Sequence, residues 1–294
     1  MKTLKKIITN KNIKIKYKKY SSIIGLSPSK GARSPKLWNL AFKKYGIKNE
    51  MLPFDVKKDN LFKLLNFLNK DRNFIGGCVT VPYKEKVFKW LGNNITKTSK
   101  KIGAVNCLFR DKKGRLIGTN TDGEAALKSF ENKFGRVNNK NVLLLGPGGA
   151  GKAVASYFSK ALNKNKKLII LGRSLNSKKF SKKIGAKWKS FKHLSKINFN
   201  EINVIINCTS IGFSVKKKHS PMTEGHLNKL PKNAKVFDII YQPKKTKLIK
   251  IAQKRKIKTI NGLEMNLIQA VLAFGYTNKK LNKNNLTKKY MKSL

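Results

Sequence analysis

The stretch that decides the fold is Asn141-Val142-Leu143-Leu144-Leu145-Gly146-Pro147-Gly148-Gly149-Ala150-Gly151-Lys152-Ala153. Its short apolar run predicts a strand, and a helix-like sequence follows the glycine cluster, from Ala153 to Phe158. A strand, a glycine-rich turn and a helix in this order can bind a phosphate group. Gly146 allows a tight turn, Gly148 lets backbone N–H groups approach an anion, and Gly151 lets helix and strand pack closely. The plain alternative is a glycine turn that binds no ligand.

The spacing of these glycines fits two nucleotide-binding motifs. Gly146, Gly148 and Gly151 match G-x-G-x-x-G, the dinucleotide fingerprint. Gly146, four residues, Gly151 and Lys152 also match most of a P-loop. A P-loop continues with Ser or Thr, whose hydroxyl binds magnesium, whereas this chain has Ala153. The missing hydroxyl favours a dinucleotide and leaves a P-loop NTPase as the alternative.

The charge of the chain is extreme. Its 67 Lys and Arg against 13 Asp and Glu give a formal net charge of +54 over 294 residues. Such a charge suggests a nucleic-acid or membrane-surface partner. The lysines are spread along the whole chain, however, and no RNA-binding or helix-turn-helix signature accompanies them. We therefore expect a solvated cationic surface that attracts anionic ligands, with no specific nucleic-acid partner, and keep a polyanion-binding protein as an alternative.

The cysteines and histidines do not form a recognisable site. Cys78, Cys107 and Cys208 each lie in an apolar run and predict buried thiols in a reducing compartment. The three histidines lack metal-ligand spacing, so we expect no metal. No apolar segment is long enough to span a bilayer. We expect a cytoplasmic protein, a monomer or homodimer, whose lysine-rich residues 1–20 are a partly ordered extension rather than a signal peptide.

Strands and helices are expected to alternate along the chain, which predicts an α/β protein with mainly parallel sheets. The expected strands are residues 21–26, 51–56, 74–81, 104–110, 116–119, 142–145, 168–171, 204–207, 236–240 and 259–260, and the expected helices are residues 35–45, 60–68, 83–91, 123–130, 153–158 and 262–276.

Five further motifs give the chain a resemblance to one family. They are Val79-Thr80-Val81-Pro82-Tyr83-Lys84, Gly103-Ala104-Val105-Asn106, Asn120-Thr121-Asp122-Gly123, Asn207-Cys208-Thr209-Ser210 and Gln269-Ala270. In this order, with the glycine turn between the third and the fourth, the chain resembles the shikimate dehydrogenases from about Ile23 to Tyr276. The resemblance implies the reversible reduction of 3-dehydroshikimate by NADPH to shikimate, a step toward chorismate and the aromatic amino acids.

The resemblance also implies two domains separated by a cleft. The substrate domain would be residues 1–121 plus 262–294, and a Rossmann-type NADP domain would be residues 122–261. Lys84 matches the family's catalytic lysine and Asp122 its carboxylate partner, which also binds a substrate hydroxyl. A ketone reduced by hydride needs a proton for the developing alkoxide, so such a pair suits the reaction. Taken alone, Asp122 would be a helix N-cap before Gly123.

Five residues match the substrate-binding positions of the family: Ser34, Thr80, Asn106, Tyr241 and Gln269. Gln269 is the most telling, because a buried amide in an otherwise apolar helix needs a partner. The first loop departs from the family pattern. The family has Ser-x-Ser-Pro, whereas this chain has Ala32-Arg33-Ser34-Pro35 in a loop one residue longer. Ser27, Ser29 or Arg33 could replace the missing hydroxyl, and quinate or another cyclic hydroxy acid becomes the nearest alternative substrate.

The predicted cofactor residues follow the glycine turn and the strand after it. They are Gly146, Gly148, Gly149, Ala150, Gly151, Arg173, Ser174, Thr209 and Gly262. NAD enzymes usually end this second strand with an acid that holds the ribose 2′-hydroxyl. Here the strand ends in Gly172-Arg173-Ser174. No carboxylate is present to repel a 2′-phosphate, and Arg173 can bind it with two hydrogen bonds. The sequence therefore favours NADP.

Overall fold

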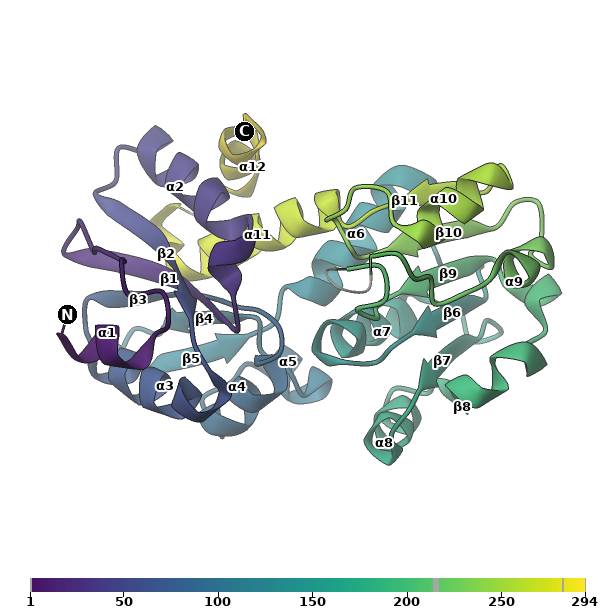
Figure 1. Ribbon diagram of the computed structural model, residues 1–294, viewed down its shortest axis with the longest axis horizontal. Helices are drawn as coiled ribbons and strands as arrows, with labels where there is room; N and C mark the ends of the chain where they lie inside the picture. The colour runs from purple at the N-terminus through teal and green to yellow at the C-terminus, as the bar shows by residue number, and fades with distance from the viewer. Residues whose placement is uncertain (1, 214–216, 282, 294) are drawn as a thin grey trace. The chain divides into compact units, whose positions relative to one another are not determined.

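The computed structural model describes residues 2–213, 217–281 and 283–293. The chain divides into two compact units, one of residues 1–121 and 267–294 and the other of residues 122–266. Each unit contains its own sheet with helices around it (Figure 1). The α/β class expected from the sequence is confirmed. The assignment of a substrate to one unit and NADP to the other stays a prediction.

The first unit is built on a five-stranded mixed sheet in the order β2-β1-β3-β4-β5. Strands β1 (Lys19–Gly25), β2 (Asn49–Asp55) and β3 (Phe74–Val79) run parallel. Strands β4 (Cys107–Arg110) and β5 (Leu116–Thr119) continue the sheet antiparallel. The carboxyl ends of β1, β3 and β5 therefore lie at the same edge as the start of β4.

Helices supply the apolar cores of this unit. One core joins α3 (Leu61–Lys70) and α4 (Lys84–Leu91) to the sheet through residues such as Leu64 and Val87. The other joins α2 (Ser34–Lys44) and α11 (Leu263–Thr277) through Trp38 and Phe274, whose rings meet edge to face at 5.3 Å between centroids. The remaining helices are α1 (Lys2–Ile7), α5 (Lys97–Ile102) and α12 (Asn284–Lys292).

The N-terminal extension is more ordered than the sequence predicted. Leu4 and Ile8 are 2% exposed and belong to the core of α3 and α4, because an apolar residue at every fourth position gives the lysine-rich segment a buried side. The extension also meets the outer edge of β2. There the Asn10 carboxamide donates to Pro53 O at 2.8 Å and accepts from Asp55 N at 3.0 Å.

The second unit contains a six-stranded parallel sheet in the order β11-β10-β9-β6-β7-β8. Its strands are β6 (Val142–Leu145), β7 (Leu168–Gly172), β8 (Lys187–Ser190), β9 (Val204–Asn207), β10 (Lys235–Asp238) and β11 (Lys258–Ile260). Its helices are α6 (Asp122–Phe134), α7 (Gly149–Ala161), α8 (Leu175–Lys183), α9 (Glu224–Asn228) and α10 (Lys247–Lys254). The strand order is that of the doubly wound dinucleotide-binding fold.

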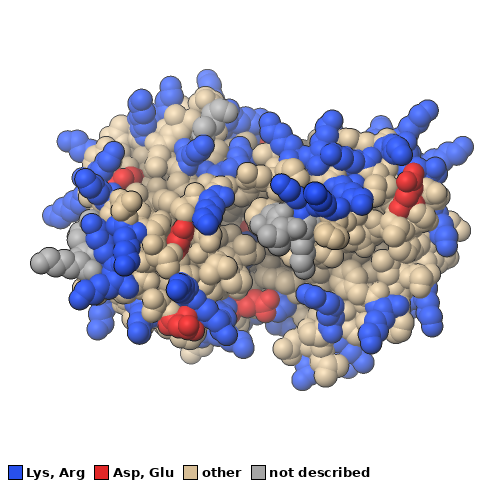
Figure 2. All heavy atoms as spheres, viewed as in Figure 1, with Lys and Arg blue, Asp and Glu red and all other residues tan. Residues whose placement is uncertain are grey.

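The cationic side chains are dispersed. Figure 2 shows lysine and arginine over the whole visible face, with few acidic side chains between them. The ion pairs Arg115–Asp111 and Lys128–Glu124 each join residues four apart at the surface. This distribution fits the solvated cationic surface expected from the sequence.

Candidate functional site

The glycine turn joins β6 to α7 as the opening stretch predicted, and close packing explains two of its glycines. Gly146 has a φ of +86°, which favours glycine, and a Cβ there would lie 2.7 Å from the Thr209 methyl group. A Cβ on Gly151 would lie 2.1 Å from Gly146 O. A side chain at position 146 would displace Thr209, and one at position 151 would push α7 away from the end of β6, so both glycines are required by the fold itself.

The start of α7 leaves donors for an anion. Gly148 is the N-cap, and the first intrahelical bond runs from Lys152 N to Gly148 O at 2.8 Å. The N–H groups of Gly149, Ala150 and Gly151 precede that bond, at the positive end of the helix. A Cβ on Gly148 would meet no atom within 4 Å, so the turn is open on that side. The geometry fits a bound pyrophosphate.

The position of this turn in the sheet is the expected place for a ligand. The chain passes from β6 to β7 on one side, and β9 lies on the other side of β6. The connections therefore turn in opposite directions from the carboxyl ends of β6 and β9, which forms a topological switch point. Thr209 follows β9, so the structure brings this predicted residue against Gly146 of the turn.

The end of β7 carries the residues predicted to select the cofactor. β7 ends at Gly172, and Arg173 and Ser174 follow it as exposed residues. Ser174 is the N-cap of α8, where its hydroxyl oxygen accepts a hydrogen bond from Ser177 N at 3.3 Å. This cap uses the oxygen and leaves the hydroxyl proton for a donor role. No acidic residue occurs between Gly172 and Phe180.

A buried polar network that the sequence did not predict supports the Thr209 loop. The Asn207 carboxamide accepts from Thr209 Oγ1 at 2.7 Å and donates to Asp238 Oδ1 at 3.0 Å. Asp238 also accepts from Thr246 Oγ1 at 2.7 Å and Ile240 N at 3.1 Å. Asn207 and Asp238 have no exposed surface. The network fixes the segments that follow β9 and β10.

Burial makes Asp238 a source of pH-dependent stability. Burial raises its pKa to about 6, although hydrogen bonds from Thr246, Ile240 and Asn207 act in the opposite direction. An unfolded aspartate titrates near pH 3.9. Between about pH 4 and 6 the folded state therefore holds this proton while the unfolded state has lost it, so the contribution of Asp238 to stability falls as pH rises, by about 3 kcal/mol over the whole interval.

We expect the variant Asp238→Asn to lack this decline. The free energy of unfolding is measured with urea for both proteins from pH 4 to pH 7. The value for the variant minus the value for the parent protein should increase by up to about 3 kcal/mol as pH rises. The exposed Asp59 provides the matched change Asp59→Asn, for which we expect a difference close to zero at every pH. A difference between Asp238→Asn and the parent that stays constant with pH would contradict the argument.

Cys208 lies beside the same network. Burial raises the pKa of its thiol well above the ordinary value, and the negative charges of Asp238 and Asp122 act in the same direction. The thiol is therefore protonated and is not a nucleophile at neutral pH. Cys78, Cys107 and Cys208 are free.

Three other predicted residues lie in the second unit. Asp122 is the first residue of α6 and is 4% exposed, rather than a cap outside the helix. Gly262 packs so tightly that a Cβ would lie 1.9 Å from Ile239 O, which is a structural reason for glycine beside the predicted cofactor role. Tyr241 follows β10 and is half-buried.

In the first unit, the structure brings Asn106 and Gln269 together. Asn106 Nδ2 donates to Gln269 Oε1 at 3.4 Å and to Thr121 Oγ1 at 3.0 Å. Thr121 N in turn donates to Asn106 Oδ1 at 2.8 Å, and Thr121 Oγ1 donates to Gln269 O at 3.3 Å. All three residues are at most 8% exposed. The buried amide of Gln269 thus has the partner that the sequence argument required.

Lys84, Thr80 and Ser34 lie at the same edge of the first sheet. Thr80 follows β3 and donates its N–H to Ile24 O at 2.9 Å, near the end of β1. Lys84 begins α4, and its carbonyl accepts from Val105 N at 3.0 Å, next to Asn106. Ser34 begins α2 and is 3% exposed. The carboxyl ends of β1 and β3 thus carry the predicted substrate residues of this unit.

No group of three or more His, Cys, Asp or Glu side chains in the described ranges could hold a metal ion. Over the same ranges, no helix has the length and apolar character that a membrane span requires.

Comparison with known proteins shows the family of this chain. Residues 23–108 match the model described as shikimate dehydrogenase substrate binding domain, and residues 128–265 match the model described as shikimate / quinate 5-dehydrogenase. The shikimate dehydrogenase (NADP(+)) of Pyrococcus furiosus is 36% identical over 258 residues, which cover 87% of this chain and 89% of the relative. The chain belongs to the shikimate dehydrogenase family.

Further relatives agree with this assignment. The shikimate dehydrogenase (NADP(+)) of Methanocaldococcus jannaschii is 35% identical, over 86% of this chain and 90% of the relative. A solved shikimate dehydrogenase in complex with NADP+ superposes with a TM-score of 0.79 at 30% identity, over 94% and 95% of the two chains. The enzyme from Aquifex aeolicus gives a TM-score of 0.79 at 28% identity, over 95% and 98%.

The first loop, where the chain departs from the family pattern, is anchored by a residue that the sequence did not single out. Asp55, at the end of β2, accepts from Ser29 N at 2.9 Å, and its other carboxylate oxygen accepts from the Ser29 hydroxyl. Ser29 is thus held by Asp55. The backbone carbonyl of Asp55 accepts a hydrogen bond from Thr9 N, in the N-terminal extension, at 2.8 Å. The N-terminal extension, Asp55 and the loop form one connected structure.

Two signals could have found the missed residues. Thr121 lies inside the quoted motif Asn120-Thr121-Asp122-Gly123, and its place between Asn106 and Gln269 makes it part of the candidate site. Asp55 and Asp238 are two of only 13 acidic residues, each lies within a predicted strand, and each ends the observed strand. In so basic a chain, a carboxylate at a strand end is an informative residue.

Proposed function

We propose that this protein is a shikimate dehydrogenase, which reversibly reduces 3-dehydroshikimate to shikimate with NADPH. The observation that carries the proposal is the family membership over nearly the whole chain, with relatives named shikimate dehydrogenase (NADP(+)) that are about 35% identical. The glycine turn at the switch point and the polar residues at the strand ends of the first unit support the proposal, because they would supply the two kinds of binding surface that the reaction needs.

Lys84 and Asp122 are the proposed acid–base pair. Bound NADPH supplies the hydride that reduces the carbonyl carbon, and a proton must reach the carbonyl oxygen as its negative charge develops. The ammonium group of Lys84 can hold and deliver that proton. The carboxylate of Asp122 can orient the lysine and accept a hydrogen bond from a substrate hydroxyl. In the opposite direction, the pair accepts the proton of the substrate alcohol.

The substrate-binding roles follow from donor and acceptor chemistry. The amides of Asn106 and Gln269 and the hydroxyl of Thr80 offer both donors and acceptors, which suits ring hydroxyls. The hydroxyl of Ser34 is proposed to bind the substrate carboxylate, and Tyr241 is proposed to lie near the same carboxylate and the nicotinamide. Because Asn106 and Gln269 already bond to each other, substrate hydroxyls would exchange with or extend an existing network rather than bind isolated amides.

The cofactor-binding residues are proposed on the same basis. The N–H groups of Gly149, Ala150 and Gly151 would bind the pyrophosphate, with Gly146, Gly148 and Thr209 shaping the turn and Gly262 the adjacent segment. Arg173 and Ser174 would bind the 2′-phosphate of NADP, since both are exposed at the end of β7 and neither is negatively charged. We further propose a cytoplasmic enzyme that acts as a monomer or homodimer on small-molecule substrates.

The direct test measures reduction of NADP+ by shikimate at the nicotinamide absorbance band. The values of kcat/KM for shikimate and quinate, each with NADP+ and NAD+, should be highest for shikimate with NADP+. A preference for quinate would overturn the substrate assignment. This assignment is the one that Ala32 affects, because Ala32 replaces the first serine of the family's loop. A preference for NAD+ would overturn the cofactor assignment. Neither result would change the fold.

We expect Asp55→Ala to raise KM for shikimate about tenfold while kcat stays within about threefold, because the variant frees the loop before Ser34 and leaves Lys84 in place. Losing a hydrogen-bonded carboxylate partner in this way costs on the order of 1.5 kcal/mol, which corresponds to about tenfold. Steady-state kinetics with varied shikimate provides the measurement.

Asp71→Ala is the matched control. Asp71 also fixes a turn of the first unit, through Asn73 N at 2.8 Å and the Tyr20 hydroxyl at 2.6 Å, but it lies before β3, at the opposite edge of the sheet. We expect it to lower stability without changing KM. Equal changes of KM in both variants would mean that Asp55 acts only through general stability.

A further inference from the structure

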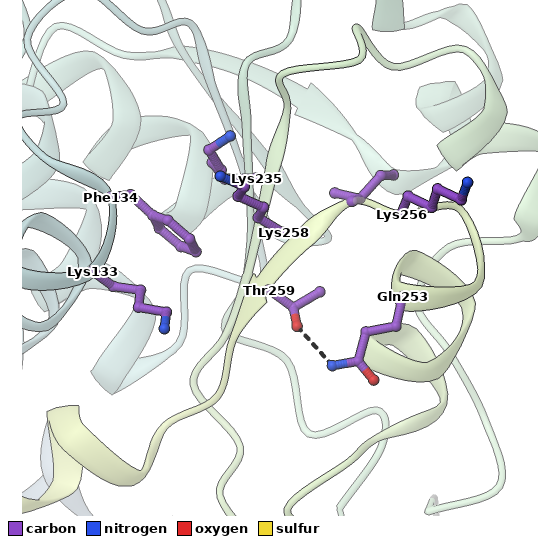
Figure 3. A pocket seen from close by; sticks show the side chains of 8 residues that line it. Lys133, Phe134, Lys235, Gln253, Lys256, Lys258 and Thr259 are labelled. Carbon is purple, nitrogen blue, oxygen red and sulfur yellow. Dashed lines mark hydrogen bonds between the residues drawn. The ribbon is translucent and has the colours of Figure 1, made fainter.

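A concave site lies in the second unit, away from the glycine turn. It is a cavity of about 640 Å³, which falls in the usual range for small-molecule sites. Lys235 and Lys258 are the first residues of β10 and β11, so the cavity opens at the amino ends of these strands (Figure 3). The glycine turn follows the carboxyl end of β6 in the same parallel sheet. The two sites are therefore at opposite edges of the sheet.

The cavity concentrates positive charge. Four of the eight described residues that line it are lysines, Lys133, Lys235, Lys256 and Lys258, and none of the eight is acidic. Lys235 and Lys258 are register partners on neighbouring parallel strands, so their side chains leave the sheet on the same face. Burial lowers the pKa of Lys235, and the positive charges of Lys258 and Lys140 lower it further. A bound anion would relieve this repulsion.

One of these lysines, Lys256, has a strained backbone. Lys256 has a φ of +56°, and it is the one non-glycine residue with positive φ in the described parts of the chain. It ends the turn after α10, where Ile257 N donates to Ala252 O at 3.0 Å. Glycine or asparagine usually takes such a position, since other residues cost on the order of 1 kcal/mol there. Strain of this kind is concentrated at binding sites in proteins.

The other residues that line the cavity indicate which kind of anion would bind there. The Phe134 ring forms an apolar surface, with Lys235 Nζ 5.9 Å from its centroid. Thr259 follows Lys258 on β11, so its side chain leaves the sheet on the opposite face, where Thr259 Oγ1 accepts from Gln253 Nε2 at 3.2 Å (Figure 3). A phosphate group suits Lys235 and Lys258, and an apolar body suits the ring.

We propose that this cavity binds a small organic phosphate, with the phosphate held by Lys235 and Lys258 and the apolar body against Phe134. The ligand would be a phosphate monoester of a small cyclic or aromatic compound. Such a compound is a dianion at neutral pH and matches both the charge and the ring. The site is separate from the phosphate-binding positions proposed for NADP.

The test is calorimetric titration of the full chain with phenyl phosphate at about 150 mM salt, where long-range attraction to surface lysines is screened. We expect saturable binding of one molecule, at least tenfold weaker in Lys235→Gln/Lys258→Gln. The charge-retaining Lys235→Arg/Lys258→Arg should keep most of the affinity, and Arg173→Gln should bind as the parent does. Inorganic phosphate should bind several-fold more weakly than phenyl phosphate.

The matched control is Lys164→Gln/Lys167→Gln. It removes two exposed charges just before β7, at the same edge of the sheet but outside the cavity. We expect this control to change the affinity less than twofold. Equal losses in the two glutamine variants would assign the binding to general surface charge and overturn the proposal, as would the absence of saturable binding to the parent. Equal binding of inorganic phosphate would overturn the role of Phe134.

Discussion

Replacing Lys84 with alanine is expected to lower kcat for shikimate oxidation about a thousandfold, within the range that a positioned general acid or base contributes. The ammonium group is the proposed source of the proton for the carbonyl oxygen, and alanine leaves that oxygen without a donor. Lys84 is half-buried at the first turn of α4, and its backbone carbonyl is bonded to Val105 N. The substitution should therefore leave the helix in place. Stopped-flow or steady-state absorbance at the nicotinamide band gives kcat.

Lys89→Ala is the matched control, because Lys89 lies on the same helix and is exposed. We expect its kcat within twofold of the parent. Affinity for NADPH, measured by fluorescence titration, should be unchanged in both variants, since Lys84 belongs to the first unit and the glycine turn to the second. A fall of less than tenfold in Lys84→Ala would assign the proton transfer to another group, with Asp122 the first to examine.

Replacing Arg173 with glutamine is expected to have the second large effect, and it should weaken the use of NADP+ but not of NAD+. We expect kcat/KM for NADP+ to fall about 30-fold, in line with the loss of a hydrogen-bonded contact to a charged group of about 2 kcal/mol. The value for NAD+, which has no 2′-phosphate, should stay within threefold. The ratio of the two kcat/KM values is therefore the measurement.

Lys182→Gln controls for the loss of one positive charge near the cofactor. Lys182 is exposed in the last turn of α8, whereas Arg173 precedes the first. We expect its NADP+ to NAD+ ratio to equal that of the parent. If Arg173→Gln lowers kcat/KM for NADP+ and for NAD+ by the same factor, Arg173 acts on the pyrophosphate or on the fold rather than on the 2′-phosphate.

The parts of the fold that the sequence predicted correctly are those with strong local signals. Apolar runs such as Val142–Leu145 are too short and too hydrophobic for a surface helix, and they became the central strands. Glycine at 146 and 151 marks close backbone approach, which the structure confirms. Thr80 follows the carboxyl end of β3, and Asn106 precedes β4, which is antiparallel to β3, so both residues lie at the same edge of the first sheet.

Three of the elements missed from the sequence, α8, α12 and β8, share one cause. Helices α8 and α12 and strand β8 are so rich in lysine that their apolar positions are few, and the hydrophobic period is weak. The long lysine side chain tolerates helix, strand and loop alike, so tertiary packing decides these segments. In α12, the buried residues Thr287 and Met291 provide this tertiary packing.

The polar networks could not have been predicted either, because their members are distant in sequence. Asp238 meets Asn207 across two strands, and Asp55 meets both Ser29 and the N-terminal extension. Each contact depends on strand order, which local patterns do not specify. The scarcity of acidic residues is the one sequence feature that points to them.

The outer edge of β2 has a consequence for how the protein behaves at high concentration. Asn39 donates to Met51 O at 3.1 Å and its carboxamide oxygen accepts from Met51 N, while Asn10 does the same for Pro53 O and Asp55 N. Two carboxamides thus take the place of a neighbouring strand. A β-strand of another molecule finds no unpaired backbone group at these positions, so the edge cannot seed intermolecular sheets. A deletion that removes Asn10 would expose the backbone of Pro53 and Asp55 to such pairing.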